Sequence, residues 1–187
     1  NIPYSTNVDF IADKSSAQIN AFTINPNNSF ANGKDEKHIA FNIIDKNNNP
    51  VPGIEIELSA DNQAQLKKTK LLTDDQGNAS TTMTSQIAGV TTVTAWVNQK
   101  DRKETTHFIA DLSNGKIISL TPSAKPYIAD GKTAVTFTAV VEDNNHNILP
   151  DAKVIWTTDR DQQIVSINEI STTNNQGVAQ TTVTSTQ

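Results

Sequence analysis

The sequence predicts an all-β protein made of two β-sandwich domains in tandem, and three observations support this prediction. Short motifs recur in the same order about one hundred positions apart, apolar and polar residues alternate with a period of two, and Gly, Asn and Asp separate the alternating segments. A repeat of this length is too long for a solenoid unit and has the size of a whole small domain. No window sustains the apolar spacing of an amphipathic helix, so we expect strands throughout.

Four motifs define the repeat. Three of them return after 98 positions and the fourth after 100, which gives the second copy two extra residues. The copies lie at 10–13 and 108–111, at 31–34 and 129–132, at 45–49 and 143–147, and at 73–77 and 173–177. We therefore expect one domain over 14–111 and a second over 112–187. Residues 1–13 align with the last strand of the first copy, so we interpret them as the tail strand of a preceding repeat.

The alternating segments keep the same inward positions in both copies, as expected when one buried face fixes the register of each strand. The inward residues of the first copy are Ile39, Phe41 and Ile43, then Ile54, Ile56 and Leu58, then Ala79, Thr81 and Met83, and finally Val93, Ala95 and Val97. Their counterparts in the second copy are Phe137, Ala139 and Val141, then Ala152, Val154 and Trp156, and then Ala179, Thr181 and Val183. About seven or eight short strands per complete copy are typical of a two-sheet sandwich.

Turn residues lie between these segments. The pairs Asn-Gly at 32–33 and Asp-Gly at 130–131 supply the positive φ that a tight turn requires. Gly77 and Gly177 are expected to do the same before the strand that follows each of them.

The second domain is expected to lack its last two strands. It stops after its strand at 177–185 and has no counterpart of residues 88–111, which hold two strands in the first copy. An incomplete sandwich exposes core residues and an unpaired edge, so we expect residues outside this sequence, or a neighbouring chain, to complete the sheet. The junction at 110–115 lacks the Gly/Ser-rich composition of a flexible linker, and we expect a semi-rigid connection there.

Charge and composition argue against several classes of protein. The formal net charge is −5 and the Lys and Arg residues form no basic stripe, so nucleic acid is not expected as a partner. The chain has no cysteine, which excludes disulfides, thiolate metal sites and cysteine nucleophiles. No apolar run reaches the roughly 18 residues of a membrane-spanning helix. We therefore expect a membrane anchor only in a region outside this sequence.

Three ordered motifs carry a family resemblance. They are Ala-Asn/Asp-Gly-Lys before a strand, Asp-x-Asn-x-Asn-x-x-Pro before Ile-x-Ile or Val-x-Trp, and Thr-Asp/Asn-Asp/Asn-Gln-Gly before Ala-x-Thr-Thr. Together they resemble group 1 bacterial Ig-like domains, the repeats of the intimin/invasin family of outer-membrane adhesins. The resemblance covers 14–111 in full and the second copy up to its end. It implies tandem immunoglobulin-like β-sandwiches in the extracellular, surface-exposed part of a bacterial protein, with no catalytic residues.

The Asp-x-Asn-x-Asn runs at 45–49 and 143–147 look like the start of a calcium loop. The motif then fails, because its glycine and bidentate glutamate positions hold Pro50 and Ile56 in the first copy. Asn and Asp also end strands through hydrogen bonds of their own side chains. We interpret both runs as turns, with calcium binding as the alternative, and expect neither a metal nor another cofactor.

Other titratable residues give no pattern of catalysis. Asp13 and Asp111 lie at equivalent junctions, where an ion could bind, but a solvated carboxylate is the interpretation we favour. The histidines are replaced by other residues in other copies, and none belongs to an evident Ser/His/Asp constellation. They are His38, His107 and His146. Glu55 and Glu57 alternate with inward residues and should face solvent, so we do not expect an enzyme.

Trp96 is the candidate interaction residue. Its neighbours Ala95 and Val97 occupy inward positions, which sets the indole on the opposite face of the strand. An outward aromatic residue can anchor an interface, or it can simply cover a neighbouring strand. Trp156 falls on the inward face with Val154, and we expect it in the core.

Three functional hypotheses follow. In the first, the chain is a repeat segment of an intimin/invasin-like virulence adhesin that mediates or presents cell adhesion as a semi-rigid stalk. Its partner would be a host-cell surface protein or glycan, or another bacterial cell. The second is a mechanical spacer without a ligand. The third is an ancillary module of a secreted polysaccharide-degrading enzyme, which would need a row of exposed aromatic residues, whereas only Trp96 and Tyr127 are available.

Overall fold

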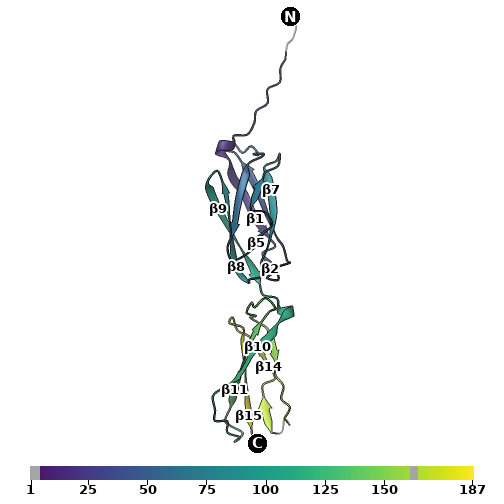
Figure 1. Ribbon diagram of the computed structural model, residues 1–187, viewed down its shortest axis with the longest axis vertical. Helices are drawn as coiled ribbons and strands as arrows, with labels where there is room; N and C mark the ends of the chain where they lie inside the picture. The colour runs from purple at the N-terminus through teal and green to yellow at the C-terminus, as the bar shows by residue number, and fades with distance from the viewer. Residues whose placement is uncertain (1–4, 161–163) are drawn as a thin grey trace. The chain divides into compact units, whose positions relative to one another are not determined.

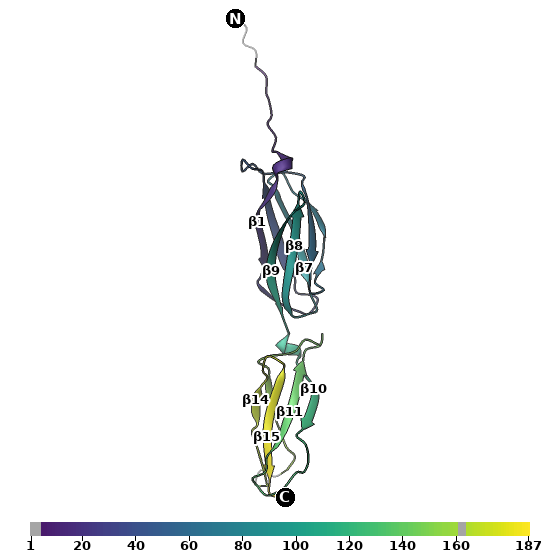
Figure 2. The ribbon, with the colours of Figure 1, turned by 90° about the vertical axis from the view of Figure 1, so that its left-hand side faces the viewer.

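The structure, a computed structural model, describes residues 5–160 and 164–187. In this part the chain forms strands β1 to β15 and two short 3₁₀ helices, η1 (Lys14–Ser16) and η2 (Leu112–Asn114), and no α-helix. The strands build two sandwich units, which Figures 1 and 2 show from two sides. The all-β prediction with tandem sandwiches is confirmed.

The chain divides into two compact units. The first comprises the residues up to Ser29 together with Gly33–Phe108, and the second comprises Phe30–Asn32 together with Ile109–Gln187. Residues 5–13 form no strand, and the side chain of Phe10 is 96% exposed. We predicted that residues 1–13 are the tail strand of a preceding repeat, and this stays a prediction. Residues 1–4 lie outside the described part of the chain.

The first unit has two layers of strands. One sheet has the order β1-β3-β7-β5 and the other β2-β9-β8-β4-β6. In the second sheet, β8 pairs antiparallel with β4 on one side and with β9 on the other. The strands are β1 (Gln18–Asn25), β2 (Asn28–Phe30), β3 (Lys37–Ile44), β4 (Glu55–Ala60), β5 (Gln65–Leu66), β6 (Lys70–Leu72), β7 (Asn78–Thr84), β8 (Gly89–Val97) and β9 (Lys100–Ile109).

The core of the first unit lies between these sheets and follows the predicted alternation. Ile39 and Ile43 of β3 are fully buried, and Phe41 between them packs on Phe22 of β1 with ring centroids 4.6 Å apart. From the other sheet, β8 contributes three buried apolar residues in alternation. They are Val93, Ala95 and Val97. Period-two burial on both facing sheets removes apolar surface from water, which is the main stabilising term for such a fold.

A buried lysine interrupts this apolar core. Lys37 lies at the start of β3, and its side chain is completely covered. Its Nζ donates hydrogen bonds to the carbonyl oxygens of Pro26 (2.9 Å) and Asn27 (2.7 Å) and lies 4.8 Å from the ring centroid of Phe108. These contacts compensate in part for burying a charge, and burial lowers the pKa of Lys37. Its counterpart in the second unit is Val135.

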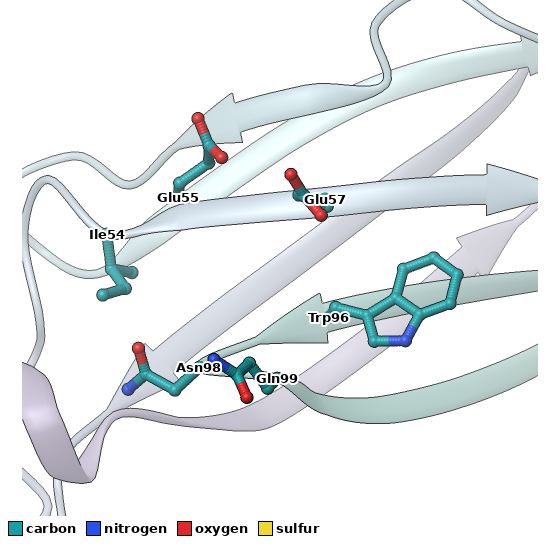
Figure 3. Close-up of a pocket in the computed structure, with 6 residues that line it drawn as sticks. All are labelled: Ile54, Glu55, Glu57, Trp96, Asn98 and Gln99. Atoms are coloured by element: carbon teal, nitrogen blue, oxygen red, sulfur yellow. The ribbon is translucent and has the colours of Figure 1, made fainter.

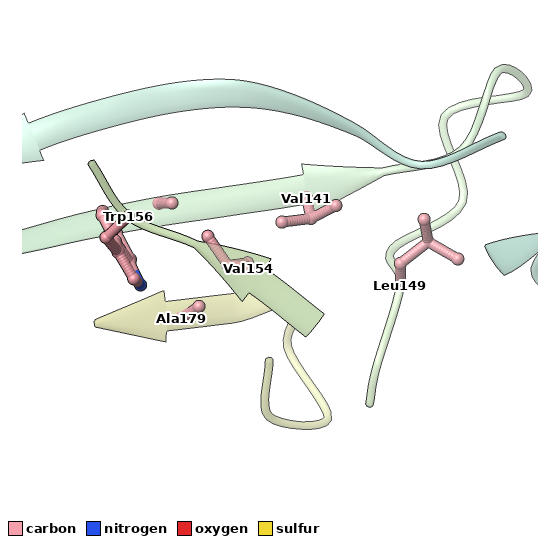
Figure 4. Close-up of a cluster of buried hydrophobic side chains, with 6 residues drawn as sticks. Val141, Leu149, Val154, Trp156 and Ala179 are labelled. Atoms are coloured by element: carbon pink, nitrogen blue, oxygen red, sulfur yellow. The ribbon is translucent and has the colours of Figure 1, made fainter. Parts of the chain in front are cut away.

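The second unit has one sheet of four strands, in the order β10-β11-β15-β13, and a second sheet that contains only β12 and β14. Its core cluster contains Trp156, as predicted for an inward tryptophan (Figure 4). The Nε1 of this residue donates a hydrogen bond to Ser171 Oγ (2.8 Å). The cluster consists of Ala139, Val141, Leu149, Val154, Trp156 and Ala179. The strands are β10 (Lys116–Pro122), β11 (Val135–Glu142), β12 (Lys153–Ile155), β13 (Val165–Ile167), β14 (Ile170–Thr172) and β15 (Val178–Ser185).

The short second sheet changes burial across this unit. Phe137 and Val183, both expected in the core, are only half-buried, and an open cleft of about 370 Å³ lies beside them. In the first unit the strand β4 pairs with β8, whereas β12 has only β14 as a partner among the described residues. Ile155 is 68% exposed, but it lies at the outward position equivalent to Glu57, so its exposure follows from the face it occupies.

One glycine in each unit fixes the same close approach of two chain segments. Gly77 and Gly177 have positive φ angles of 74° and 68°. The carbonyl oxygen of each accepts a hydrogen bond from the N–H of its strand neighbour, Ile43 (2.8 Å) or Val141 (2.9 Å). A Cβ atom on Gly77 would lie 2.3 Å from Ile43 O, and one on Gly177 would lie 2.7 Å from Val141 O. Both the conformation and the space therefore require glycine.

Candidate interaction surface

The outer face of the five-stranded sheet carries a straight row of side chains centred on Trp96. The register pairs Glu57 of β4 with Trp96 of β8 and with Lys70 of β6, and it pairs Trp96 with Asp101 of β9. Directly paired residues of neighbouring strands project on the same face of a sheet. The four side chains therefore form one row across four strands, with the indole between two carboxylates.

Trp96 faces outward as the alternation of β8 predicts. Val97 and Ala95 on either side of it are buried, whereas Trp96 is half-buried. Figure 3 looks onto the outer face of the sheet and shows the indole nearly face-on, so that the ring lies along the sheet with one face turned to solvent. This ring is the largest apolar element of the row.

Glu57, beside Trp96, and Glu55 on the same strand are paired with a lysine of the same face. Lys70 Nζ lies 2.6 Å from Glu57 Oε1 and 3.0 Å from Glu55 Oε1. The hydrogen bond from Lys70 and its positive charge lower the pKa of Glu57, and the hydrogen bonds to Glu57 and Glu55 raise the pKa of Lys70. All three groups are exposed, and such pairs stabilise a fold little. Their effect here is to balance the charge of the surface.

An open cleft of about 570 Å³ lies along this row. It is lined by Ile54, Glu55, Glu57, Trp96, Asn98 and Gln99 (Figure 3). Asn98 and Gln99 form the two-residue turn between β8 and β9, and both have positive φ, at 50° and 65°. Such turns match the twist of a hairpin but strain a residue such as Gln99. Asn98 Nδ2 donates hydrogen bonds to Lys14 O (2.8 Å) and Ser15 O (3.4 Å), which holds the turn in place.

The predicted turns at the Asp-x-Asn-x-Asn runs are closed by hydrogen bonds to their first carboxylate. Asp45 Oδ1 accepts from Asn47 N (2.8 Å) and Asn49 N (2.9 Å), while Oδ2 accepts from Asp13 N (3.1 Å) and Asn49 Nδ2 (3.0 Å). The side-chain hydrogen bond from Asn49 is the main cause that lowers the pKa of Asp45 to about 2. Four N–H groups thus surround the carboxylate that would have to bind a cation.

Asp143 repeats this arrangement in the second unit. It accepts hydrogen bonds from the backbone N–H groups of Asn145, Asn147 and Asp111 at 2.8, 2.9 and 3.2 Å, and from Asn147 Nδ2 at 3.0 Å. Burial alone would raise the pKa of Asp143, but the bonds from Asn147 hold it below its ordinary value. The same device therefore anchors the start of each unit to its loop.

Asp13 and Asp111, the candidate ion ligands at the junctions, cap short helices. Asp13 Oδ1 accepts from Ser15 N (3.0 Å) and Ser15 Oγ (2.6 Å), and Asp111 Oδ1 accepts from Ser113 N and Oγ at the same distances. Side-chain oxygens commonly satisfy the first N–H groups of a helix in this way. Across residues 5–160 and 164–187, no group of three or more His, Cys, Asp or Glu side chains could hold a metal ion.

The three histidines come from different elements, His38 from β3, His107 from β9 and His146 from the loop after β11. His38 and His107 are exposed, and His146 Nδ1 lies 3.2 Å from Glu142 Oε2. Tyr127, the second exposed aromatic residue considered, donates from its hydroxyl to Ser123 O (2.9 Å) in the second unit.

The sequence pointed to Trp96 as an interaction residue, and it placed Glu55 and Glu57 on the solvent face without assigning them to a site. Lys70 and Asp101 come beside them only because β4 lies between β6 and β8, and β9 follows β8. This strand order is not readable from alternation alone. The Asn98-Gln99 turn was not readable from polarity either, because the charged residues Lys100–Glu104 of β9 follow it directly.

Fold and repeat together define a class of protein: tandem immunoglobulin-like β-sandwich repeats. The family model of the bacterial Ig-like domain (group 1) matches residues 19–109 and 117–187. The chain therefore belongs to the family of group 1 bacterial Ig-like domains, and the resemblance seen in its motifs is confirmed.

A curated relative agrees with this assignment, and two solved structures share the fold. The chain is 30% identical over 188 residues to the inverse autotransporter adhesin YeeJ of Escherichia coli (strain K12), covering 96% of this chain and 8% of YeeJ. The fold resembles InvD of Yersinia pseudotuberculosis, with a TM-score of 0.63 and 19% identity over 94% of this chain and 50% of that one. It also resembles the Escherichia coli adhesin FdeC, with a TM-score of 0.55 and 17% identity over 94% and 57%.

The chain thus spans only a small part of the curated relative that it matches. Among the residues that the structure describes, no helix has the length and apolar character needed to cross a membrane.

Proposed function

We propose that this chain is an extracellular repeat segment of a bacterial outer-membrane adhesin, and that it presents cell adhesion as a semi-rigid stalk. The observation that carries the proposal is a pair of group 1 bacterial Ig-like domains in a chain that is 30% identical over 96% of its length to an inverse autotransporter adhesin. The membrane anchor would belong to another region of the protein. The partner would be a host-cell surface protein or glycan, or another bacterial cell, and the segment would have no catalytic role.

Two local features support a semi-rigid connection. The segment between β9 and β10 contains η2, whose first N–H groups are capped by Asp111. The backbone N–H of Asp111 donates in turn to Asp143 of the adjacent loop (3.2 Å). The segment that leads into the second unit is therefore held by side chains of that unit, and it is not a free Gly/Ser linker.

The proposal is tested on intact cells of the bacterium that encodes the chain. An antibody raised against residues 14–187 should stain unpermeabilised cells, and deletion of these residues from the full-length protein should reduce adherence to host cells or to other bacteria. Absence of staining at normal expression, or full adherence after the deletion, contradicts the proposal.

A replacement separates a segment with its own ligand from a spacer. In this variant an unrelated pair of Ig-like domains of equal length stands in place of residues 14–187. Recovery of adherence identifies the segment as a spacer, because only length is restored. Continued loss of adherence with normal surface display identifies a segment that binds.

A further inference from the structure

The indole of Trp96 has unused binding capacity. Its ring lies along the outer face of the sheet with one face open (Figure 3). In the described part of the chain its Nε1 has no hydrogen-bond partner, whereas Nε1 of Trp156 donates to Ser171. The fold of the first unit does not use this tryptophan as core, since β8 already contributes alternating buried residues from its other face.

The polar groups around the ring offer both donors and acceptors. The amide of Gln99 lines the same cleft and has no partner among the described side chains, so it can donate and accept. Glu57 uses Oε1 for Lys70, which leaves Oε2 as an acceptor, and Asn98 uses Nδ2, which leaves Oδ1. A mixed set of donors and acceptors suits hydroxyl groups, because each hydroxyl can serve in both ways.

The charge of the surface favours a neutral ligand. A cation could stack on tryptophan, and carboxylates on both sides would attract it. However, Lys70 lies within 3.0 Å of both Glu55 and Glu57 and already supplies the positive charge on one side. A second cation would have to compete with this ammonium group, whereas a neutral molecule would not.

We infer that the cleft of Ile54, Glu55, Glu57, Trp96, Asn98 and Gln99 is a binding site for a single neutral sugar ring. One face of a hexopyranose carries mainly C–H groups, which pack on the negative face of an aromatic ring, and its hydroxyl groups would reach the polar groups around the indole. Only one aromatic residue lines the cleft, so the site fits one ring and not an extended polysaccharide.

The second unit differs at two residues of this site. Glu55 and Glu57 correspond to Lys153 and Ile155 on the equivalent strand β12. The fold therefore does not require a carboxylate at either position. The site would take a sugar whether or not the whole protein is an adhesin.

The two tryptophans permit a direct test by NMR, because each unit contains one indole N–H signal. The probes are the methyl glycosides of glucose, galactose, mannose and N-acetylglucosamine, titrated into the ¹⁵N-labelled chain of 187 residues. We expect at least one glycoside to shift the indole signal of Trp96 and to leave that of Trp156 unchanged. Trp96→Ala should raise the dissociation constant of the sugar at least about tenfold. Saturation-transfer NMR on the sugar signals measures binding in this variant.

Two further variants control for folding. Trp96→Phe keeps a smaller aromatic face and should retain weakened binding, and Leu72→Ala removes an exposed apolar side chain outside the cleft and should bind as the unchanged chain does. The inference is overturned if no glycoside shifts the Trp96 signal, or if binding survives Trp96→Ala. It is also overturned if N-acetyl-lysine methylamide shifts this signal and the sugars do not, because the site would then bind a cation. Loss of surface staining in the test of the proposed function would leave these results unchanged.

Discussion

The two units start from the same pattern of residues but differ in how much of the sandwich is covered. In the first unit a five-stranded sheet faces a four-stranded one, and the core residues of β3 and β8 are buried. In the second unit a two-stranded sheet faces a four-stranded one, and Phe137 and Val183 stay half-buried at equally inward positions. Inward position therefore does not by itself give burial, because the facing sheet must also be present.

The largest change is expected when the second unit receives the hairpin that the first unit has. Residues 88–109 fused directly after Gln187 continue the repeat in phase, because Ser85 and Ser185 occupy equivalent positions. The added strands should pair with the open edge of β12, as β8 pairs with β4. Covering the core there should raise the free energy of unfolding of the second unit by about 3 kcal/mol or more. Urea denaturation, followed by the fluorescence of Trp156, measures this free energy. Phe replaces Trp96 and its copy in the fused hairpin, so that Trp156 is the single fluorescent tryptophan.

In a matched fusion, the added hairpin carries Pro in place of its copies of Val93 and Ala95, while the first unit is unchanged. Proline there prevents the added strand from pairing. This fusion should leave the unfolding midpoint of the second unit where it is in the unextended chain. If the native hairpin behaves like the proline version, the open edge of β12 is not what limits burial in the second unit.

A second comparison concerns the glycines that occupy the same place in both units. Gly77→Ala and Gly177→Ala should each destabilise their own unit by about 2 kcal/mol or more, because a Cβ atom meets a backbone carbonyl and the positive φ is strained. The effect should be larger for Gly77, where the Cβ–oxygen distance is 2.3 Å against 2.7 Å. Tryptophan fluorescence reports each unit when it is measured in two parallel chains, one with Phe in place of Trp156 and one with Phe in place of Trp96.

Gly53→Ala is the control for these glycines. Gly53 also has a positive φ, of 60°, but a Cβ atom there would meet only the end of the flexible Lys14 side chain at 3.3 Å. Gly53→Ala should lower the free energy of unfolding of the first unit by less than Gly77→Ala does. Equal losses at all three positions would mean that conformation, and not the close approach of the strands, sets the requirement for glycine.

Several features of the fold could be predicted because they depend on local pattern. Alternation placed Ile39, Phe41 and Ile43 on the buried face, and the structure confirms their burial. The same alternation would have placed Lys37 on the buried face, two residues before Ile39. Lysine is rarely fully buried without a partner, and only the fold brings the carbonyl groups of Pro26 and Asn27 within reach of its ammonium group.

The candidate site was predictable only in part. The alternation of inward and outward residues was enough to place Trp96 on the outer face. Its position beside Glu57 and Asp101 depends on which strands pair and in which register. Pairing between strands that are distant in sequence is set by the packing of the whole sandwich, so no local pattern contains it. The row around the indole could therefore be recognised only in the structure.

Lys37 offers a third comparison, because its counterpart in the second unit is Val135. Lys37→Val should destabilise the first unit by about 1–2 kcal/mol, since it leaves a cavity and removes the contact with Phe108. Burial lowers the pKa of Lys37 in the folded state. At a pH between this lowered pKa and the ordinary one, the unfolded chain therefore binds the ammonium proton more tightly than the folded chain does. In the unchanged chain stability should therefore rise with pH in the window below the ordinary value of 10.5, and the variant should lack this contribution.

The exposed Lys103 serves as the control for that substitution. Lys103→Val removes a positive charge from the surface of β9 and should change the free energy of unfolding by less than about 0.5 kcal/mol. A loss for Lys103→Val as large as for Lys37→Val would show that net charge, and not the buried position, is responsible.

The smallest effect is expected where the two units are most alike. Asp45 and Asp143 accept the same set of four hydrogen bonds, and both have a pKa below the ordinary value of 3.8, that of Asp45 being about 2. Because the folded state stabilises the charged carboxylate, this contribution to stability is complete above the ordinary pKa and is lost as the pH falls toward the pKa of the folded state.

Asp45→Asn should therefore reduce the acid sensitivity of the first unit only, and Asp143→Asn that of the second. Thermal unfolding between pH 5 and 2 measures this, with the tryptophan of each unit as reporter in a chain whose other tryptophan is replaced by Phe. Asp75→Asn, on an exposed turn, should leave both profiles unchanged. If the acid sensitivity of one unit does not respond to its own substitution, the loop device is not equivalent in the two units, and the incomplete second sheet would then affect the loop as well as the core.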